Sequence, residues 1–278
     1  MGRLEDFGGY KYFVERFCDG PKQSSNVKEL NWRLSSTCFF RREKAKVLTQ
    51  LPDKSRQYIE VDISNRKEYD KAEADLIQYL RTYKNADDEK VAKALRGEVM
   101  VKMGILKAIS ARGKIKVFSE FIHDVIDGGE KLIVLLPKEV VLELKKMFPK
   151  AVTVTGEDNA TQKQMAVDAF QNNPDCTLII LNYKSGGTGL TLTASSRVAF
   201  IEFPWTFSDC EQAEDRAHRN GQKNNVNCYY FLGRNTIDEY MYGVIQRKKG
   251  IANGVTGTDD VVKENVVDMA MDLFKGKL

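Results

Sequence analysis

The chain of 278 residues can form one large domain or one domain with appendages. Hydrophobic residues make up 42%, as in ordinary folded soluble proteins, and the basic excess is only 43 − 39 = 4 charges. Such an excess permits a polyanionic partner without indicating one. Five scattered cysteines, with no Cys-x-x-Cys pair, indicate a reducing compartment and argue against a metal site. The polar opening stretch and the short apolar runs argue against a signal peptide and a membrane span.

The first half of the chain has a helical pattern with one exception. Residues 1–50 look helical and polar, residues 56–63 look like a strand, and residues 66–127 show successive amphipathic helical patterns. Residues 87–97 are charged enough to form a solvated connector between two of these helices.

The second half alternates regularly between strand and helix patterns. Uninterrupted apolar runs, typical of strands buried on both faces, occupy residues 132–136, 151–154, 177–181, 198–201 and 227–232. Helical patterns lie between most of them, at residues 138–147, 161–171 and 209–219, and a last helix is expected within residues 259–274. This alternation predicts an α/β fold, a mainly parallel sheet with helices on both faces.

A glycine-rich stretch, K-S-G-G-T-G-L-T-L-T, occupies residues 184–193 directly after one predicted strand. Parallel sheets bind ligands at the carboxyl ends of their strands, and glycines let backbone N–H groups approach anionic oxygens. The stretch lacks the third glycine of a dinucleotide fingerprint and the G-K-[ST] ending of a Walker A motif. A tight turn that needs positive φ is the simpler alternative.

A second motif, Q-A-E-D-R-A-H-R-N-G-Q, occupies residues 212–222. Helical spacing places Gln212, Arg216 and Arg219 on one side and small residues on the other, so both guanidiniums are expected to point outward. They can grip phosphate oxygens, or they can form a solvated face in which Gln212 and Asp215 are their partners.

With these two motifs in this order, the sequence resembles the second RecA-like lobe of a superfamily 2 helicase of the Swi/Snf type, a branch of double-stranded DNA translocases. The glycine stretch resembles that family's motif V, in a form closest to annealing-helicase-like members, and residues 212–222 resemble its motif VI. Residues 202–206 resemble the segment whose tryptophan lies against DNA, and residues 153–156 resemble a DNA-contacting Thr-Gly motif. Residues 26–54 resemble the brace that links the two lobes.

The resemblance implies a role for individual residues. Arg216 and Arg219 would be the catalytic arginine fingers that reach the γ-phosphate of ATP. The residues expected to contact ATP are Gln212, Gly187, Gly189 and Thr191. The residues expected to contact DNA are Thr155, Gly156, Lys184, Ser185, Gly186 and Trp205. The chain departs from the family pattern at Lys163, Thr191 and Asn220, where arginine, asparagine and an aliphatic residue are usual.

The sequence contains no G-x-x-x-x-G-K-[ST] motif. The resemblance therefore implies that an N-terminal RecA-like lobe supplies the phosphate cradle and the acidic residues that hold Mg²⁺. We expect the C-terminal half of an ATP-dependent helicase or translocase that acts on double-stranded DNA and is inactive by itself. The alternatives are a stand-alone nucleic-acid-binding module and, less consistent with the failed fingerprint, a Rossmann-like enzyme. The expected location is inside the cell, cytoplasmic or nucleoid-associated, without a membrane partner.

Four segments are expected along the chain. Residues 1–63 would hold the inter-lobe brace and the end of the first lobe, and residues 64–112 a helical connector. Residues 113–250 would form the second RecA-like lobe, and residues 251–278 a C-terminal tail helix.

Overall fold

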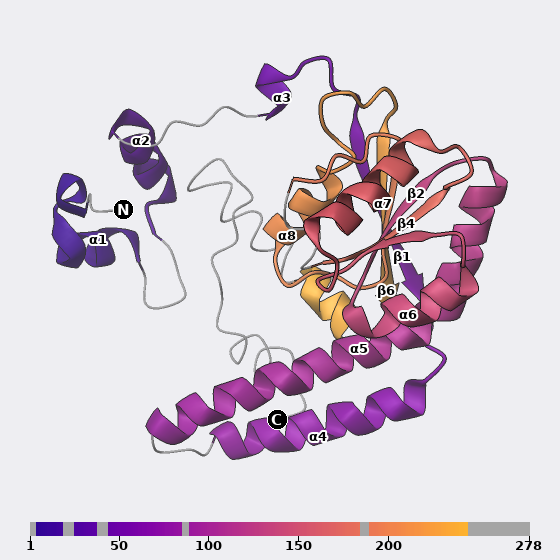
Figure 1. Ribbon diagram of the computed structural model, residues 1–278. Coiled ribbons are helices and arrows are strands. Elements are labelled where there is room, and N and C mark those ends of the chain that lie inside the picture. The colour runs from indigo at the N-terminus through magenta and orange to yellow at the C-terminus, as the bar shows by residue number, and fades with distance from the viewer. Residues whose placement is uncertain (1–3, 19–24, 38–43, 85–88, 184–188, 244–278) are drawn as a thin grey trace. The chain divides into compact units, whose positions relative to one another are not determined.

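The computed structural model describes residues 4–18, 25–37, 44–84, 89–183 and 189–243 (Figure 1). The chain divides into two compact units. The smaller unit contains residues 1–49, 206–208 and 243–264, and the larger contains residues 50–205, 209–242 and 265–278. The expected tail helix at residues 259–274 lies outside the described residues.

The smaller unit is helical, as the sequence predicts. Its described elements are η1 (Leu4–Phe7), α1 (Gly9–Phe17), α2 (Val27–Thr37) and α3 (Lys44–Val47). Phe7, Phe17 and Leu30 form a small apolar core. A core of this size contributes little to stability, and polar contacts accompany it. The Glu29 carboxylate accepts two hydrogen bonds from Arg16, at 3.0 and 2.6 Å.

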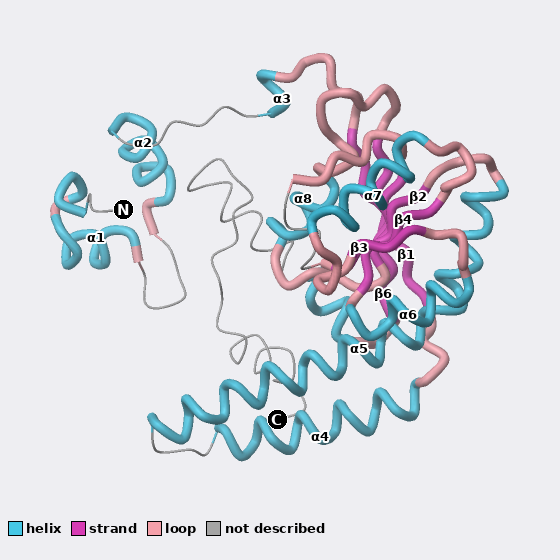
Figure 2. Tube along the Cα trace, viewed as in Figure 1, coloured by secondary structure: helices cyan, strands magenta, loops and turns pink. Residues whose placement is uncertain are grey.

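The larger unit is built on a six-stranded sheet in the order β1-β6-β5-β2-β4-β3, and every pair of neighbouring strands is parallel. Figure 2 shows the strands in magenta with helices around them. Its strands are β1 (Lys54–Val61), β2 (Leu132–Leu136), β3 (Val152–Val154), β4 (Leu178–Asn182), β5 (Arg197–Phe200) and β6 (Val226–Gly233). Its helices are α4 (Arg66–Lys84), α5 (Glu89–Asp127), α6 (Lys138–Met147), α7 (Ala160–Asn172) and α8 (Phe207–Glu214). This is the predicted α/β fold, a parallel sheet with helices packed on it.

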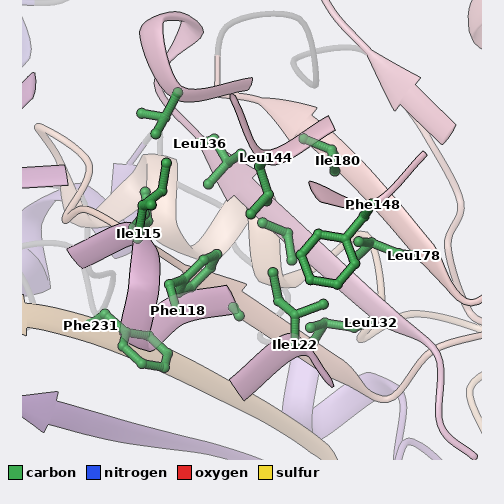
Figure 3. Packing of buried hydrophobic residues seen from close by; sticks show 14 of the residues in the cluster. Ile115, Phe118, Ile122, Leu132, Leu136, Leu144, Phe148, Leu178, Ile180 and Phe231 are labelled. Carbon is green, nitrogen blue, oxygen red and sulfur yellow. The ribbon is translucent and has the colours of Figure 1, made fainter. Parts of the chain in front are cut away.

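One face of the sheet is covered by α5 and α6, and an apolar core fills the space between these helices and the sheet (Figure 3). From α5, Ile115, Phe118 and Ile122 are buried in this core together with β2 and β4. The rings of Phe118 and Phe231 meet edge to face with centroids 4.9 Å apart. Each such side chain contributes about 1.5–3 kcal/mol on burial, so the uninterrupted apolar runs secure the sheet.

The opposite face carries the alternate strand residues and is covered by α7 and α8. Phe200 and Tyr230 stack at 4.3 Å on this face. From α8, Cys210 and Ala213 are buried, as the sequence predicts for the small-residue side of this helix. Small side chains let α8 pack closely on the sheet, so its backbone position is well defined.

The helices α4 and α5 lie side by side as a hairpin (Figure 1). The predicted solvated connector at residues 87–97 is wrong in part, because α5 already begins at Glu89. The C-terminal half of α5 crosses the sheet, where Lys114 Nζ forms a wholly buried ion pair with Asp238 at 2.5 Å. One continuous helix therefore joins the expected connector to the expected lobe.

The strand β1 enters the same sheet. It pairs with β6 over its whole length, from Lys54 opposite Val226 to Val61 opposite Gly233. This stretch belongs to the expected segment 1–63, together with the preceding helices. An apolar run shows that a strand is buried but does not show which sheet buries it.

Candidate functional site

The helix of the second motif is shorter than its sequence predicts. It ends at Glu214, and residues 215–222, here named the arginine segment, continue as turns. The expected helix to Arg219 is therefore wrong at its C-terminal end. The main-chain carbonyl of Arg216 leaves the helical pattern and accepts a hydrogen bond from Leu192 N at 2.9 Å. A tertiary contact has replaced the next helical turn.

The two arginines of this segment are held inward rather than outward. Arg216 is only 7% exposed, so the prediction that both guanidiniums project from an outer stripe is wrong. Within the described residues, Arg216 Nε has no hydrogen-bond partner. Arg219 is half-buried and donates from Nη1 to the carbonyl of Leu190 at 3.1 Å. Burial and the charge of Arg219 both lower the pKa of Arg216.

This arrangement favours an anion. Desolvation and like charge both raise the free energy of a guanidinium, and an opposing negative charge would relieve both. Among the residues that the structure describes, no carboxylate pairs with Arg216 or Arg219. Asp215, the partner expected for a solvated face, instead lies 3.2 Å from Lys54 Nζ.

The end of the glycine-rich stretch lies against the arginine segment. Gly189 has a φ of +55°, a left-handed conformation that favours glycine, although a Cβ there would meet nothing within 4 Å. Leu190 and Leu192 both bond to the arginine segment, which places Gly189 and the exposed Thr191 beside it. Gln212 is exposed on α8. The predicted contacts Lys184, Ser185, Gly186 and Gly187 lie outside the described residues.

Gln222 closes the arginine segment as a structural tie. Its buried Nε2 donates to the carbonyls of Ser195 at 2.8 Å and Ala217 at 3.2 Å. Its Oε1 accepts from the backbone of Lys223 and Asn224. These bonds fix the segment to the connection that precedes β5. The Gln222 side chain, which ends the motif, therefore holds the backbone in place and has its own donor and acceptor groups bonded.

The group that anchors the start of this segment was not among the residues predicted from the sequence. The carboxylate of Glu214 is buried and accepts hydrogen bonds from Arg56 Nε at 2.6 Å and Tyr230 OH at 2.7 Å. Lys54 Nζ lies 2.8 Å from its other oxygen. A signal was present: at helical spacing Glu214 falls on the same side as Cys210 and Ala217. An acidic residue on an apolar stripe requires a cationic partner.

The predicted DNA contacts follow the carboxyl ends of two strands. Thr155 comes directly after β3, and its backbone N and Oγ1 donate to Asp158 Oδ2 at 2.5 and 2.9 Å. Gly156 is exposed, and a Cβ there would meet nothing within 4 Å. Trp205 comes shortly after β5, which β2 and β4 separate from β3. Thr155 and Trp205 therefore share an edge of the sheet without being neighbours.

Trp205 is partly buried and lies against a buried lysine. Lys107 Nζ, from α5, lies 4.3 Å from the centroid of the tryptophan ring and donates to the carbonyl of Phe203 at 2.7 Å. Glu202 lies 3.5 Å from the same ammonium group. The ring thus has one face held by the protein, an arrangement consistent with both a packing role and a contact role.

The candidate residues lie at two opposite edges of the sheet. A crossover helix in a parallel sheet runs antiparallel to the strands, so α8 returns the chain from the carboxyl edge to the amino edge. Contacts agree with this path: Ser195, which accepts from Gln222 through its carbonyl, donates from Oγ to Lys131 O at 2.6 Å, just before β2. The arginine segment therefore lies toward the amino edge, and Trp205 lies at the carboxyl edge.

The described residues contain neither a cluster of metal-ligating side chains nor a helix able to span a membrane. No three His, Cys, Asp or Glu side chains in these ranges gather as they would around a metal ion. None of the described helices combines the length and apolar character needed to cross a membrane.

Comparison with known proteins supports the resemblance seen in the motifs. Residues 99–221 match the family described as the helicase conserved C-terminal domain. The chain is 30% identical over 260 residues to the human DNA annealing helicase and endonuclease ZRANB3, covering 88% of this chain and 24% of that protein. It is 29% identical to the Xenopus tropicalis SWI/SNF-related matrix-associated actin-dependent regulator of chromatin subfamily A-like protein 1, covering 88% of this chain and 26% of that protein. The chain thus spans about a quarter of the length of these curated relatives.

Solved structures share the fold. The Sulfolobus solfataricus SWI2/SNF2 ATPase core domain gives a TM-score of 0.63 at 21% identity, covering 97% of this chain and 58% of that chain. The C-terminal part of the Fun30 ATPase domain gives a TM-score of 0.62 at 18% identity, covering 82% of this chain and 100% of that chain. At these identities the structures support the RecA-like arrangement and not the role of any residue.

Proposed function

Because the chain carries the C-terminal RecA-like lobe of a Swi/Snf-type superfamily 2 helicase, we propose that it supplies arginine fingers to an ATP site completed by an N-terminal lobe. The parent activity is ATP-driven translocation on double-stranded DNA. The N-terminal lobe holds the phosphates and Mg²⁺, and this lobe contributes positive charge to the γ-phosphate when the two lobes close.

The proposal rests on the pair of guanidiniums in the arginine segment. Arg216 is desolvated, Arg219 lowers its pKa further, and neither has a carboxylate partner among the described residues. Charge that develops on a transferred phosphoryl group is the kind of anion that such a pair stabilises. Gly189, Thr191 and Gln212, which lie beside or just before the pair, would contact the nucleotide, together with Gly187.

The DNA-binding side of the proposal uses the carboxyl edge of the sheet. Thr155, Gly156, Lys184, Ser185, Gly186 and Trp205 would track the DNA backbone. Such contacts carry little sequence information and make affinity depend on salt concentration. A motor of this kind works inside the cell, wherever its DNA lies.

The test is substitution of each arginine in the two-lobed protein. We expect Arg216→Ala and Arg219→Ala each to lower kcat by about 10³–10⁵-fold while the Kd for ATP changes only a few-fold. The reason is that the other lobe supplies most ground-state contacts, whereas the fingers act in the transition state. Single-turnover hydrolysis and equilibrium binding of a fluorescent ATP analogue separate the two effects.

The matched control is Arg234→Ala. Arg234 lies in the same unit but pairs at the surface with Glu60 and Asp62. Its removal should leave kcat unchanged. If the two finger variants lost ATP binding in proportion to rate, the assignment of the fingers would be wrong.

A further inference from the structure

A buried ion cluster joins the first strand of the sheet to the end of α8. Glu214 is the last residue of α8, and its side chain is 0% exposed. Arg56 on β1 binds it with two hydrogen bonds, from Nε at 2.6 Å and from Nη2 at 2.7 Å, and Lys54 Nζ lies 2.8 Å away. Tyr230 OH adds a third donor from β6 at 2.7 Å. We call Lys54, Arg56 and Glu214 the β1–α8 cluster.

The same short stretch before and within β1 contacts the arginine segment beyond Glu214. Lys54 Nζ reaches Asp215 at 3.2 Å, and His218 Nε2 lies 2.7 Å from the carbonyl of Pro52. Arg56 Nη2 also lies 3.4 Å from Glu211, one turn earlier in α8. Contacts from residues 52–56 thus bracket Arg216 on both sides in sequence.

We propose that the β1–α8 cluster is a positioning device: Lys54 and Arg56, by holding Glu214, set where Arg216 and Arg219 point. This inference rests on the proposed function for its catalytic consequence. It assigns a role to Lys54 and Arg56, which lie outside the two motifs from which the site was first identified.

Geometry favours positioning over a purely stabilising role. Regular helical bonding breaks down just beyond Glu214: Arg216 N bonds only three residues back, to Ala213 O at 3.3 Å, and the Arg216 carbonyl bonds Leu192 N. Side-chain ties at the ends of the segment therefore add to its orientation. Gln222 provides the tie at the far end and Glu214 the tie at the near end. A buried ion cluster is a weak source of net stability, because desolvation offsets most of the attraction, but its directional bonds fix a geometry.

Electrostatics support the charged form of the cluster. Burial raises the pKa of the Glu214 carboxyl, but hydrogen bonds from Arg56 and the charges of Lys54 and Arg56 outweigh it, so the pKa lies below its ordinary value. Burial lowers the pKa of Arg56, whereas Glu214 raises it by more, so Arg56 stays protonated.

The first test uses the 278-residue chain alone and does not depend on catalysis. In Glu214→Gln and Arg56→Met, amide hydrogen exchange in peptides that cover residues 215–222 should rise by about tenfold or more, because the local opening that exposes them becomes easier. Peptides that cover β2 and β4 should stay far better protected than residues 215–222, which shows that the sheet is intact.

The control is a second arginine–carboxylate pair in the same sheet. Arg197 on β5 binds the Glu130 carboxylate from Nε and Nη2 and also contacts Tyr229, and among the described residues its side chain bonds to none of residues 215–222. Arg197→Met should leave exchange at residues 215–222 unchanged. If exchange there stayed at the wild-type level in Glu214→Gln as well, the cluster would be structural only and the proposal would fail.

The second test measures the two-lobed protein. Misplacement of a catalytic group by about 1 Å can cost about 10²-fold in rate, so Glu214→Gln and Arg56→Met should lower kcat by about 10- to 100-fold with KM for ATP within about twofold. Arg197→Met should retain the wild-type kcat. A KM that rises in step with the fall in kcat would overturn the positioning role.

The outcomes of the two proposals are separable. If Arg216→Ala left turnover intact, the finger assignment would fail, and hydrogen exchange in the chain alone would still decide whether the cluster holds the arginine segment. If Arg216→Ala abolished turnover while Glu214→Gln changed neither exchange nor kcat, the fingers would stand and the cluster would have no positioning role.

Discussion

Glu214 is a carboxylate that is both buried and charged, and it should give the chain a defined pH dependence. Its pKa in the folded chain lies below the ordinary value of 4.5, because Arg56 and Lys54 outweigh the effect of burial. The unfolded chain therefore takes up this proton first as the pH falls. The stabilisation from Glu214 is fully present above about pH 4.5 and is lost as the pH falls through the folded-state pKa.

The measurement is urea unfolding of the wild type and Glu214→Gln over a series of pH values. Near neutral pH the wild type should be more stable, by at most about 3–5 kcal/mol, the cost of breaking a buried pair. The difference in free energy of unfolding should shrink steadily in acid. A difference that did not change with pH would mean that Glu214 is not charged in the folded chain.

At the scale of single residues, the sequence predicts which residues belong to the candidate site better than it predicts how deeply each is buried. Periodicity identified Arg216 and Arg219 and placed Cys210 and Ala213 inward, and the structure confirms the inward pair. It failed for the burial of Arg216, because the periodic argument assumed a helix that a bond between Leu192 and the Arg216 carbonyl interrupts. Such a contact joins residues far apart in sequence and has no local signature.

At the scale of elements, α5 carries two glycines that should respond oppositely to alanine. At Gly113 an added Cβ would lie 2.1 Å from Asn65 Oδ1 and 2.7 Å from the Cβ of Ile63. Asn65 is held there by a 2.9 Å bond to the carbonyl of Ile109, so it cannot move freely. We expect Gly113→Ala to destabilise the chain by about 1–3 kcal/mol through overpacking.

Gly104 is the matched control in the same helix. A Cβ there would meet nothing within 4 Å, so Gly104→Ala should stabilise the chain by up to about 1 kcal/mol through helix propensity. Thermal melts of both variants, followed by circular dichroism at the helical band, show whether the two substitutions change the stability in opposite directions. A stable Gly113→Ala chain would show that α5 does not approach residues 63–65 as closely as the structure has it.

Whole elements were predicted where burial and periodicity agree. The run at residues 132–136 coincides with β2, and the helix at residues 138–147 coincides with α6. Both depend on local pattern alone. The connector predicted at residues 87–97 is wrong from Glu89 on, because the charge on a long hairpin helix resembles that of a loop. The pairing of β1 with β6 joins residues far apart in the chain, so no local pattern predicts it.

At the scale of the whole molecule, the chain should bind nucleic acid or nucleotide weakly and turn over no ATP by itself. In the proposed function half of the ATP site would lie on another lobe, and without its phosphate cradle the proposed fingers would have no positioned phosphoryl group to stabilise. A phosphate-release assay on the purified chain, with and without duplex DNA, should give no signal above buffer. Robust DNA-stimulated hydrolysis would contradict the proposal, whereas DNA binding without turnover in the two-lobed protein would favour a stand-alone binding module.

The last prediction concerns the coupling of ATP hydrolysis to movement along DNA. In the chain, α8 separates Trp205 from the arginine segment, so one short helix links the proposed DNA contact to the proposed ATP site. Trp205→Ala in the two-lobed protein should preserve folding and basal ATP hydrolysis but lower the distance moved per ATP, because the proposed contact of the ring with the DNA backbone would be lost. Lys107 keeps its bonds to Phe203 and Glu202 in this variant, so only a small fall in melting temperature is expected. The measurement is triplex displacement per ATP hydrolysed, beside a thermal melt. If the melting temperature fell steeply while the remaining folded protein moved normally, Trp205 would be a packing residue that anchors the start of α8.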